Sequence, residues 1–149
     1  IGAAGVFSFM LSSLFITQAI AGWIGTLDVN PWVLMLAVNI FLLIAGFFLP
    51  PVAVILMAAP ILLPIITTAG FDPIWFAVIL TINMEIGLIS PPVGLNLYVI
   101  NGIAPDIKLK TILMGSLPYV ACMVIAILLL CVFPGIATWL PDYVMGPAV

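Results

Sequence analysis

The sequence predicts an all-α membrane protein with several spans, and its composition and charge pattern are the reasons. Of the 149 residues, 66% are hydrophobic and only 5% are charged, and the mean hydropathy is +1.51. This composition is typical of membrane helices and excludes a water-soluble globular domain. The two basic and five acidic residues fall between long apolar runs, with the single exception of Glu85. Because the runs lack the alternation of barrel strands, the spans are expected to be helical.

Several function classes are disfavoured by residues that the chain lacks. Two Lys and no Arg form no basic surface for nucleic acid. The absence of His removes His-based triads and His-ligated metal sites, so we expect neither an enzyme nor a cofactor. Cys122 and Cys131 lie on opposite faces of one apolar run and are expected to be packing thiols. Ile1 is not an initiator Met, and no basic residue precedes the first apolar run, so we interpret the chain as a fragment whose N-terminal part is missing.

The N-terminal part is expected to contain one span and one interfacial helix. Residues 1–17 form an apolar run that we interpret as the span. Residues 18–29 place Trp23 beside polar neighbours, which predicts a short helix at the membrane interface. Asn30 followed by Pro31 then predicts a helix start, with Asn as the cap and Pro in the first turn.

Residues 31–68 are predicted to form a helical hairpin. A straight helix of this length would be about 57 Å long, whereas the hydrocarbon core is only about 30 Å thick. The strongest breaker is the segment 46–52, whose turn carries the apolar residues Phe47, Phe48 and Leu49. A turn exposed to water would be expected to be polar. We therefore favour a re-entrant hairpin whose tip stays within the protein at membrane depth, and two full spans remain the alternative.

Residues 73–103 are again too long for one unbroken span. Pro91 and Pro92 remove two backbone donors, and proline bars the residue before it from helical geometry, so the span should break there. The two halves are expected at 74–89 and 93–103. In lipid, such a break survives only where protein or a wet cavity covers it.

The last predicted span covers residues 111–134, and a short polar tail with an interfacial Trp139 follows it. The loop at 106–110 contains both lysines of the chain, and the positive-inside rule places it in the cytoplasm. With this orientation, the hairpin opens toward the outside and the C-terminus also lies there.

The broken span is the candidate functional site. A helix broken in mid-membrane leaves carbonyls unpaired at the end of its first half, which attract cations, and N–H groups at the start of its second half, which attract anions. Oxygen-bearing side chains surround the break, at Asn83, Glu85, Ser90 and Asn96. Such ligands suit a hard cation such as Na⁺ far better than Zn²⁺ or copper. The N–H groups near Val93 to Asn96 would suit a substrate carboxylate.

Two glycines near the break are expected to let another backbone approach closely. These are Gly87 and Gly94, and the obvious partner is the hairpin tip at 46–51. Glu85 is a charge within an apolar run, which is costly in a membrane and marks a functional-site candidate. It could bind Na⁺ directly, or brace the broken helix by accepting hydrogen bonds from neighbouring N–H groups, which we favour. It could also reach the near interface as a solvated side chain.

A structural interpretation also exists for each of these features. The double proline could merely kink a helix for packing, and Asn83, Asn96 and Asn39 could each serve as interhelical hydrogen-bonding residues. The combination of features is more specific than any one of them. A hairpin and a helix break follow one another beside the charged residue that lies within an apolar run.

The segment from Glu85 to Tyr98 resembles the late signature of the large membrane subunit of TRAP (tripartite ATP-independent periplasmic) transporters. The similarity continues in the segments 30–32, 59–64 and 70–73. It implies the C-terminal repeat of an ion-transporter-type membrane domain over residues 1–149, with a re-entrant hairpin, a broken span and an elevator motion. It also implies a cytoplasmic (inner) membrane protein of bacteria or archaea. Such a subunit works with a small membrane subunit and a soluble periplasmic binding protein, and imports organic acids such as C4-dicarboxylates with Na⁺.

The resemblance also places an ion and substrate region on this sequence. It would comprise hairpin-tip and break residues, namely Gly46, Leu49, Pro50, Ser90, Pro91, Pro92, Gly94 and Asn96. Na⁺ would contact Ser90, Asn96 and carbonyls of the tip, while Glu85 and Gly87 would give structural support. Many relatives carry Asp before the proline of the tip, where this chain has Leu49, so backbone carbonyls are expected there instead. The alternative function is a structural or accessory membrane subunit without an ion site of its own.

Overall fold

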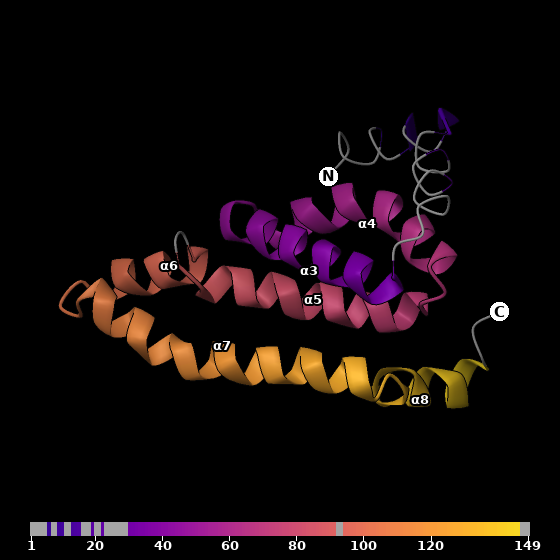
Figure 1. Cartoon of the computed structure of the whole chain (residues 1–149). Helices are drawn as coiled ribbons and strands as arrows, with labels where there is room; N and C mark the ends of the chain where they lie inside the picture. The colour runs from indigo at the N-terminus through magenta and orange to yellow at the C-terminus, as the bar shows by residue number, and fades with distance from the viewer. Residues whose placement is uncertain are drawn as a thin grey trace.

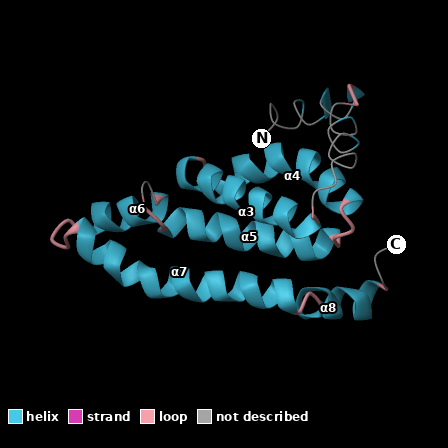
Figure 2. Ribbon diagram, viewed as in Figure 1, coloured by secondary structure: helices cyan, strands magenta, loops and turns pink. Residues whose placement is uncertain are grey.

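The computed structural model describes residues 30–91 and 94–146, together with isolated positions before residue 30, namely Val6, Phe9, Met10, Ser13, Leu14, Phe15, Ala19 and Gly22. The span predicted at 1–17 and the interfacial helix predicted at 18–29 lie outside these ranges apart from those isolated positions. The described part is helical, and only turns and short loops join its helices (Figure 2). This confirms the all-α fold class.

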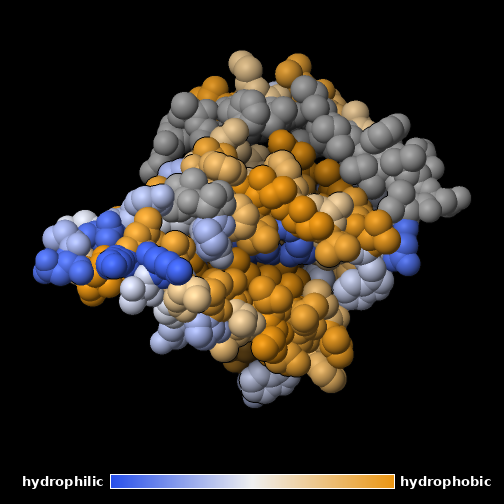
Figure 3. All heavy atoms as spheres, turned by 60° about the vertical axis from the view of Figure 1, so that its left-hand side comes forward, coloured by the Kyte–Doolittle hydropathy of each residue, from blue (hydrophilic) through white to orange (hydrophobic). Residues whose placement is uncertain are grey.

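The described helices follow one another along the chain (Figure 1) as α3 Pro31–Phe48, α4 Pro51–Thr68, α5 Pro73–Ile89, α6 Leu95–Ile103, α7 Leu109–Val132 and α8 Gly135–Met145. By length and composition, α3, α4 and α7 are candidate membrane spans, and α5 is a slightly shorter apolar helix. Apolar residues cover the central and lower part of the face shown in Figure 3, as expected for side chains that meet lipid or other membrane helices.

Helices α3 and α5 begin with the same local chemistry. The Asn30 side chain accepts a hydrogen bond from the Trp32 N–H at 2.9 Å, and Pro31 occupies the first turn, as predicted. The Asp72 carboxylate likewise accepts from the N–H groups of Ile74 and Trp75, at 2.7 and 2.9 Å. An Asx cap followed by Pro satisfies the free N–H groups of a first turn, which explains why both helices start where they do.

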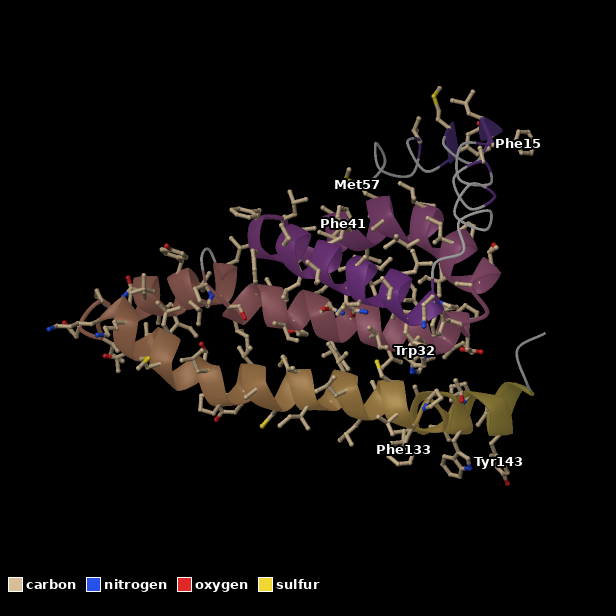
Figure 4. All side chains as sticks on the ribbon, in the orientation of Figure 1. Phe15, Trp32, Phe41, Met57, Phe133 and Tyr143 are labelled. Carbon is tan, nitrogen blue, oxygen red and sulfur yellow. The ribbon has the colours of Figure 1, made fainter. Side chains whose placement is uncertain are left out.

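The two helix starts lie together, so α3 and α5 run parallel. The Trp32 ring meets the Phe71 ring edge to face, with centroids 5.4 Å apart, and Phe71 stacks on Trp75 at 5.3 Å. Figure 4 shows Trp32 at this end of the bundle. Helix α4 follows α3 in the chain and runs antiparallel to it, which completes the hairpin. The buried core lies where these three helices meet, and its most buried large side chains are Leu42, Ile66, Trp75, Phe76, Ile79 and Met84.

Helix α5 is the central element of the described fold. It has α3 and α4 on one side and α7 on the other (Figure 1). The Trp75 indole N–H donates to the Leu130 carbonyl at 2.7 Å, which ties the start of α5 to the end of α7. The starts of α3 and α5 and the end of α7 therefore lie at one end of the bundle. The loop with both lysines lies at the other end.

The helical hairpin is present with the predicted bounds, and its turn is formed by Leu49 and Pro50. Each arm has 18 residues, which is long enough to cross a membrane. Re-entry is a statement about position in the membrane, and it stays a prediction. Phe41 and Met57 lie on the outer side of the hairpin (Figure 4), where they line an apolar groove of about 320 Å³ between its arms.

The broken span is also present, but its second half begins later than expected. Helix α5 ends at Ile89, as predicted, whereas α6 begins at Leu95 rather than at residue 93. The reason is Gly94, whose left-handed backbone (φ +48°, ψ 72°) forms the N-cap of α6. A residue in that conformation cannot belong to a right-handed helix.

The C-terminal part differs from the prediction in two ways. Helix α7 runs from Leu109 to Val132, so the predicted span at 111–134 is shifted by two residues toward the N-terminus. The expected polar tail is instead the helix α8, in which Trp139 stacks on Tyr143 with ring centroids 6.2 Å apart. Pro134 separates the two helices because proline is favoured next to helix ends and starts.

Candidate functional site

The hairpin and the broken helix touch through two glycines. A Cβ atom added to Gly87 would lie 2.6 Å from both the carbonyl carbon and the carbonyl oxygen of Gly46. Real Cβ atoms do not come this close to a backbone, so α5 meets α3 here without room for any side chain. The close approach expected at Gly87 is therefore observed, and its partner is the arm of the hairpin that leads to the tip.

This contact brings the two breaks to the same level of the bundle. Because α3 and α5 are parallel, the segments that follow Gly46 and Gly87 leave the contact in the same direction. The hairpin turn at Leu49 and Pro50 comes within about one helical turn after Gly46. Helix α5 ends at Ile89, also within one helical turn after Gly87. Segments about forty residues apart in the sequence thus end side by side (Figure 1).

Ser90 is the residue at which α5 stops, and its hydroxyl is buried. The residue is 5% exposed, has an extended backbone, and its Oγ forms no hydrogen bond within the described structure. A buried polar atom without a partner costs about 1–3 kcal/mol unless a ligand or water satisfies it. Among the described side chains, Ser90 Oγ is the only buried N or O atom without a hydrogen-bond partner. It therefore marks a place where a polar ligand is expected.

The double proline adds backbone oxygens to this place. In a continuous helix the carbonyls of Gly87 and Leu88 would accept from the N–H groups of residues 91 and 92. Both of these residues are proline and have no N–H. The structure of Pro92 lies outside the described residues, but its chemistry leaves Leu88 without that donor all the same. Two carbonyls thus join the Ser90 hydroxyl at the cation-attracting end of α5.

The start of α6 supplies groups of the opposite polarity. Gly94 accepts from the N–H groups of Leu97 and Tyr98 at 2.8 and 3.4 Å, so the N–H groups of Leu95 and Asn96 have no acceptor inside the helix. The Asn96 side chain is exposed at the surface of the described part. The close approach expected at Gly94 is local: a Cβ there would meet the Leu97 side chain and the Ser90 carbonyl, and not the hairpin tip.

Asn83 lies apart from the break and joins two helices. It is 3% exposed, and its Nδ2 donates to Asn39 Oδ1 at 2.6 Å and to the Ile79 carbonyl at 3.0 Å. Asn39 in turn donates to the Met35 carbonyl at 2.8 Å. Asn83 precedes Ser90 by about 10 Å along the helix axis. The amide therefore acts as the interhelical hydrogen-bonding residue that the sequence left as an alternative.

Glu85 does not brace the broken helix within the described part of the chain. Its side chain is exposed and forms no hydrogen bond or ion pair with any described residue. Ala77 and Thr81 are exposed on the same face, at four-residue spacing. The neighbouring faces of α5 are covered by α3, α4 and α7, which leaves Glu85 on the uncovered stripe.

Ser116 on α7 is a site residue that sequence reasoning missed. Its Oγ lies 3.1 Å from the carbonyl oxygen of Ile89, the last residue of α5, and 2.8 Å from that of Leu113. It also lines a cavity of about 360 Å³ between the end of α5, α6 and α7. A single serine in an apolar span carries no sequence signal for this role. The packing of the helices alone decides which neighbouring helix the serine faces.

The described residues contain no cluster of three or more His, Cys, Asp or Glu side chains that could hold a metal ion. Carbonyl, hydroxyl and amide groups are therefore the ligands that this region offers. They are hard oxygen donors at one helix end and N–H donors at the next, in a chain built of membrane-length helices. This is the arrangement of a membrane transporter site at a discontinuous helix.

Sequence comparisons identify the family. Residues 1–136 match the family described as tripartite ATP-independent periplasmic transporter, DctM component, and the chain belongs to this family. The family consists of transporter permease components and not of enzymes, and its members are multi-pass membrane proteins of bacterial TRAP systems. The resemblance seen in the segment from Glu85 to Tyr98 is thereby confirmed.

Individual relatives carry different substrate names. The chain is 40% identical over 143 residues, 96% of its length, to the C4-dicarboxylate TRAP transporter large permease protein DctM of Pseudomonas aeruginosa. It is 34% identical over 141 residues, 95% of its length, to the sialic acid TRAP transporter large permease protein SiaM of Vibrio cholerae. It is 37% identical over 121 residues, 81% of its length, to the isethionate TRAP transporter permease protein DctMQ of Oleidesulfovibrio alaskensis. The chain spans 33% of the first two relatives and 18% of the third.

Proposed function

We propose that this chain forms the C-terminal repeat of a Na⁺-coupled permease that imports organic acids. The observation that carries the proposal is the buried, unpartnered hydroxyl of Ser90 at the end of α5, beside the hairpin turn. No described side chain or backbone group forms a hydrogen bond with this hydroxyl. An ion that occupies the break during transport would give its oxygen a partner. The family membership supports the same function.

The cation would bind at the carbonyl end of the break. Ser90 Oγ and the carbonyls of Gly87 and Leu88 supply oxygen ligands there, and the partial negative charge of the α5 C-terminus adds to the attraction. Carbonyls of the hairpin turn at Leu49 and Pro50 are the nearest candidates to complete the site, because the contact at Gly46 holds this turn level with the break. Oxygen ligands without thiolate or imidazole favour a hard cation such as Na⁺.

The organic acid would bind at the amide end of the break. The N–H groups of Leu95 and Asn96 and the positive end of the α6 dipole favour a carboxylate. The Asn96 side-chain amide adds an N–H donor beside them, and its oxygen is a further candidate ligand for the Na⁺ ion across the break. The relatives named for C4-dicarboxylate and sialic acid transport agree with a substrate that carries a carboxylate. A cation and an anion bound to opposite ends of one break would stabilise each other, which is a physical basis for coupling.

We also propose that the hairpin is re-entrant and that it moves together with the broken helix. The hairpin turn ends level with the break, and α6 continues for about 14 Å beyond it toward the lysine loop. The tip therefore stops well short of that loop (Figure 1). The glycine contact and the bond from Asn83 to Asn39 hold α3 on α5, so the two would travel as one body in an elevator motion.

The complete transporter would contain partners. A TRAP system is tripartite by its family description, and we propose that this permease works with a small membrane subunit and a periplasmic solute-binding protein. The relative named DctMQ supports the association with the small subunit, since its name joins both components in one chain. We place the complex in the bacterial or archaeal cytoplasmic membrane, with the lysine loop in the cytoplasm.

The ion site is tested by the variants Ser90→Ala and Asn96→Ala in the complete transport system, reconstituted in proteoliposomes. Loss of one oxygen ligand is expected to raise the Na⁺ concentration for half-maximal uptake by about tenfold, since this corresponds to about 1.4 kcal/mol. Uptake of a radiolabelled organic acid is measured across a Na⁺ titration. Thr81→Ala is the matched control, because its hydroxyl bonds only to the Ala77 carbonyl of its own helix.

Normal uptake of both variants at limiting Na⁺ would show that the ion does not bind here. Unchanged Na⁺ dependence together with loss of complex assembly would instead favour the structural or accessory function. Assembly is measured by co-purification with the small membrane subunit, so the two outcomes are separated by independent readouts.

Re-entry is tested by the reactivity of Leu49→Cys after Cys122 and Cys131 have been replaced by Ala. Leu49 is 43% exposed at the hairpin turn, and Ile107 is 44% exposed in the lysine loop. In inside-out vesicles with saturating Na⁺ and substrate, an impermeant maleimide is expected to label Ile107→Cys and to spare Leu49→Cys, because an occupied re-entrant tip lies within the protein. Equal labelling of both, with and without Na⁺, would indicate two full spans.

A further inference from the structure

The hydroxyl of Ser116 lies between two carbonyls but has only one proton to donate. Its Oγ is 3.1 Å from the Ile89 carbonyl oxygen, across the interface from α7 to α5, and 2.8 Å from the Leu113 carbonyl oxygen in its own helix. Both distances are within hydrogen-bonding range. Because a hydroxyl rotates to suit its surroundings, one proton can serve either acceptor, and the side chain has two alternative bonds.

The two acceptor carbonyls differ in whether they have a hydrogen-bond donor other than Ser116. Leu113 lies inside α7, where its carbonyl accepts from the backbone N–H four residues later. Ile89 is the last residue of α5, and Ser90 follows it as the C-cap, before the two prolines. The Ile89 carbonyl thus belongs to the group that a helix end leaves without an intrahelical donor. The bond from Ser116 therefore matters more to Ile89 than to Leu113.

We propose that Ser116 is a positioning residue that holds the Ile89 carbonyl while the break is free of cation and releases it when Na⁺ binds. This rests on the proposed ion site at the end of α5. In the cation-free state the hydroxyl donates to Ile89. When Na⁺ binds, the Ile89 carbonyl turns to the ion as a further oxygen ligand beside those of Gly87 and Leu88, and the hydroxyl proton of Ser116 turns to Leu113. No carbonyl of this set is then left unsatisfied in either state. Ser116 contacts neither the ion nor the substrate.

This arrangement predicts an effect of unusual sign. Ser116→Ala removes the donor of a helix-end carbonyl in the cation-free state, whereas in the Na⁺-bound state it removes only a second bond to a carbonyl that is already satisfied. The variant therefore destabilises the cation-free state more than the Na⁺-bound state. The Na⁺ concentration for half-maximal uptake is expected to fall by about fivefold, the effect of about one hydrogen bond. The maximal rate should fall as well, because Na⁺ leaves more slowly.

The experiment compares Ser116→Ala, Ser116→Thr and Ser116→Cys with the unchanged transporter, all in the complete reconstituted system. Equilibrium Na⁺ binding to the purified protein and Na⁺-dependent uptake are both measured. Ser116→Thr keeps the hydroxyl and is expected to keep the original Na⁺ affinity. Ser116→Cys has a weaker donor and should shift the affinity in the same direction as Ala, but less. Thr81→Ala again controls for loss of a hydroxyl that bonds only within its own helix.

Weaker or unchanged Na⁺ binding in Ser116→Ala would overturn the proposal, because general damage to the site weakens binding and only loss of the alternative donor strengthens it. If Ser116→Ala fails to assemble, the sign of the shift in Ser116→Cys decides in the same way. Failure of the ion site itself has a different signature: Ser90→Ala then leaves the Na⁺ dependence unchanged. If Ser90→Ala raises the Na⁺ concentration for half-maximal uptake but Ser116→Ala does not lower it, only the proposed role of Ser116 is rejected.

Discussion

Gly87→Ala is expected to separate the hairpin from the broken helix and to abolish transport. The new Cβ would lie 2.6 Å from the carbonyl carbon and oxygen of Gly46 and 2.9 Å from its Cα. These are backbone atoms, which cannot rotate away as a side chain would, so α3 must shift bodily. Overpacking of this kind costs about 3 kcal/mol at the upper end of its usual range. The shift also moves the hairpin turn away from Ser90.

The matched control for this change is Gly46→Ala, which approaches the same contact from the other helix. Its Cβ would meet the Met84 Cε at 3.4 Å and the Gly87 Cα at 3.6 Å, which is close to ordinary van der Waals contact. We expect a small change in the thermal unfolding midpoint of the detergent-solubilised protein for Gly46→Ala and a large decrease for Gly87→Ala. Uptake should follow the same order. Equal effects of the two variants would contradict the helix spacing seen here.

Gly94→Ala is expected to disrupt the break itself. Gly94 has φ +48°, a conformation that costs other residues about 1–3 kcal/mol. An added Cβ would also lie 2.8 Å from the Leu97 Cδ1 and 2.9 Å from the Ser90 carbonyl oxygen. The start of α6 must then move relative to the end of α5, which displaces the N–H groups of Leu95 and Asn96. Uptake is expected to fall by about tenfold or more, as about 1.4 kcal/mol of lost binding already gives a factor of ten.

Gly102→Ala is the control for this prediction, since Gly102 lies in the same short helix with open space around its Cα and no positive φ. Alanine is favoured over glycine in a helix interior by about 0.5–1 kcal/mol, so this variant should be neutral or slightly stabilised. The apparent affinity for the organic acid and the thermal midpoint are measured for both. Transport by Gly94→Ala at the level of Gly102→Ala would mean that the left-handed turn is dispensable.

Local chemistry made the elements of this fold predictable. The helix starts at Asn30 and Asp72 follow from a side-chain cap and the proline behind it, and the end of α5 at Ile89 follows from the double proline. The hairpin was predictable because an apolar run of that length cannot remain one straight helix in a membrane. These features depend on residues within a few positions of one another, so no knowledge of the tertiary structure is needed to locate them.

The same reasoning was less successful with individual side chains. Glu85 attracted attention because a charge is costly in an apolar run, yet it lies on the exposed stripe of α5. Asn83 was a candidate ligand, yet its amide bonds to Asn39. Helix α8 was taken for a polar tail. In each case the outcome depends on which neighbouring helix covers which face, and the period of a helix alone does not contain that information.

The sequence by itself determined that this chain crosses the membrane as helices, that it contains a hairpin and a broken span, and that Ser90 lies at the break. Backbone chemistry explains this, because prolines, glycines and caps act on their immediate neighbours. Only the tertiary structure decided that Gly46 rests on Gly87, which brings the two breaks together, and that Ser116 reaches Ile89 from another helix. Those contacts join residues 41 and 27 positions apart, and only the packing of whole helices against one another sets them.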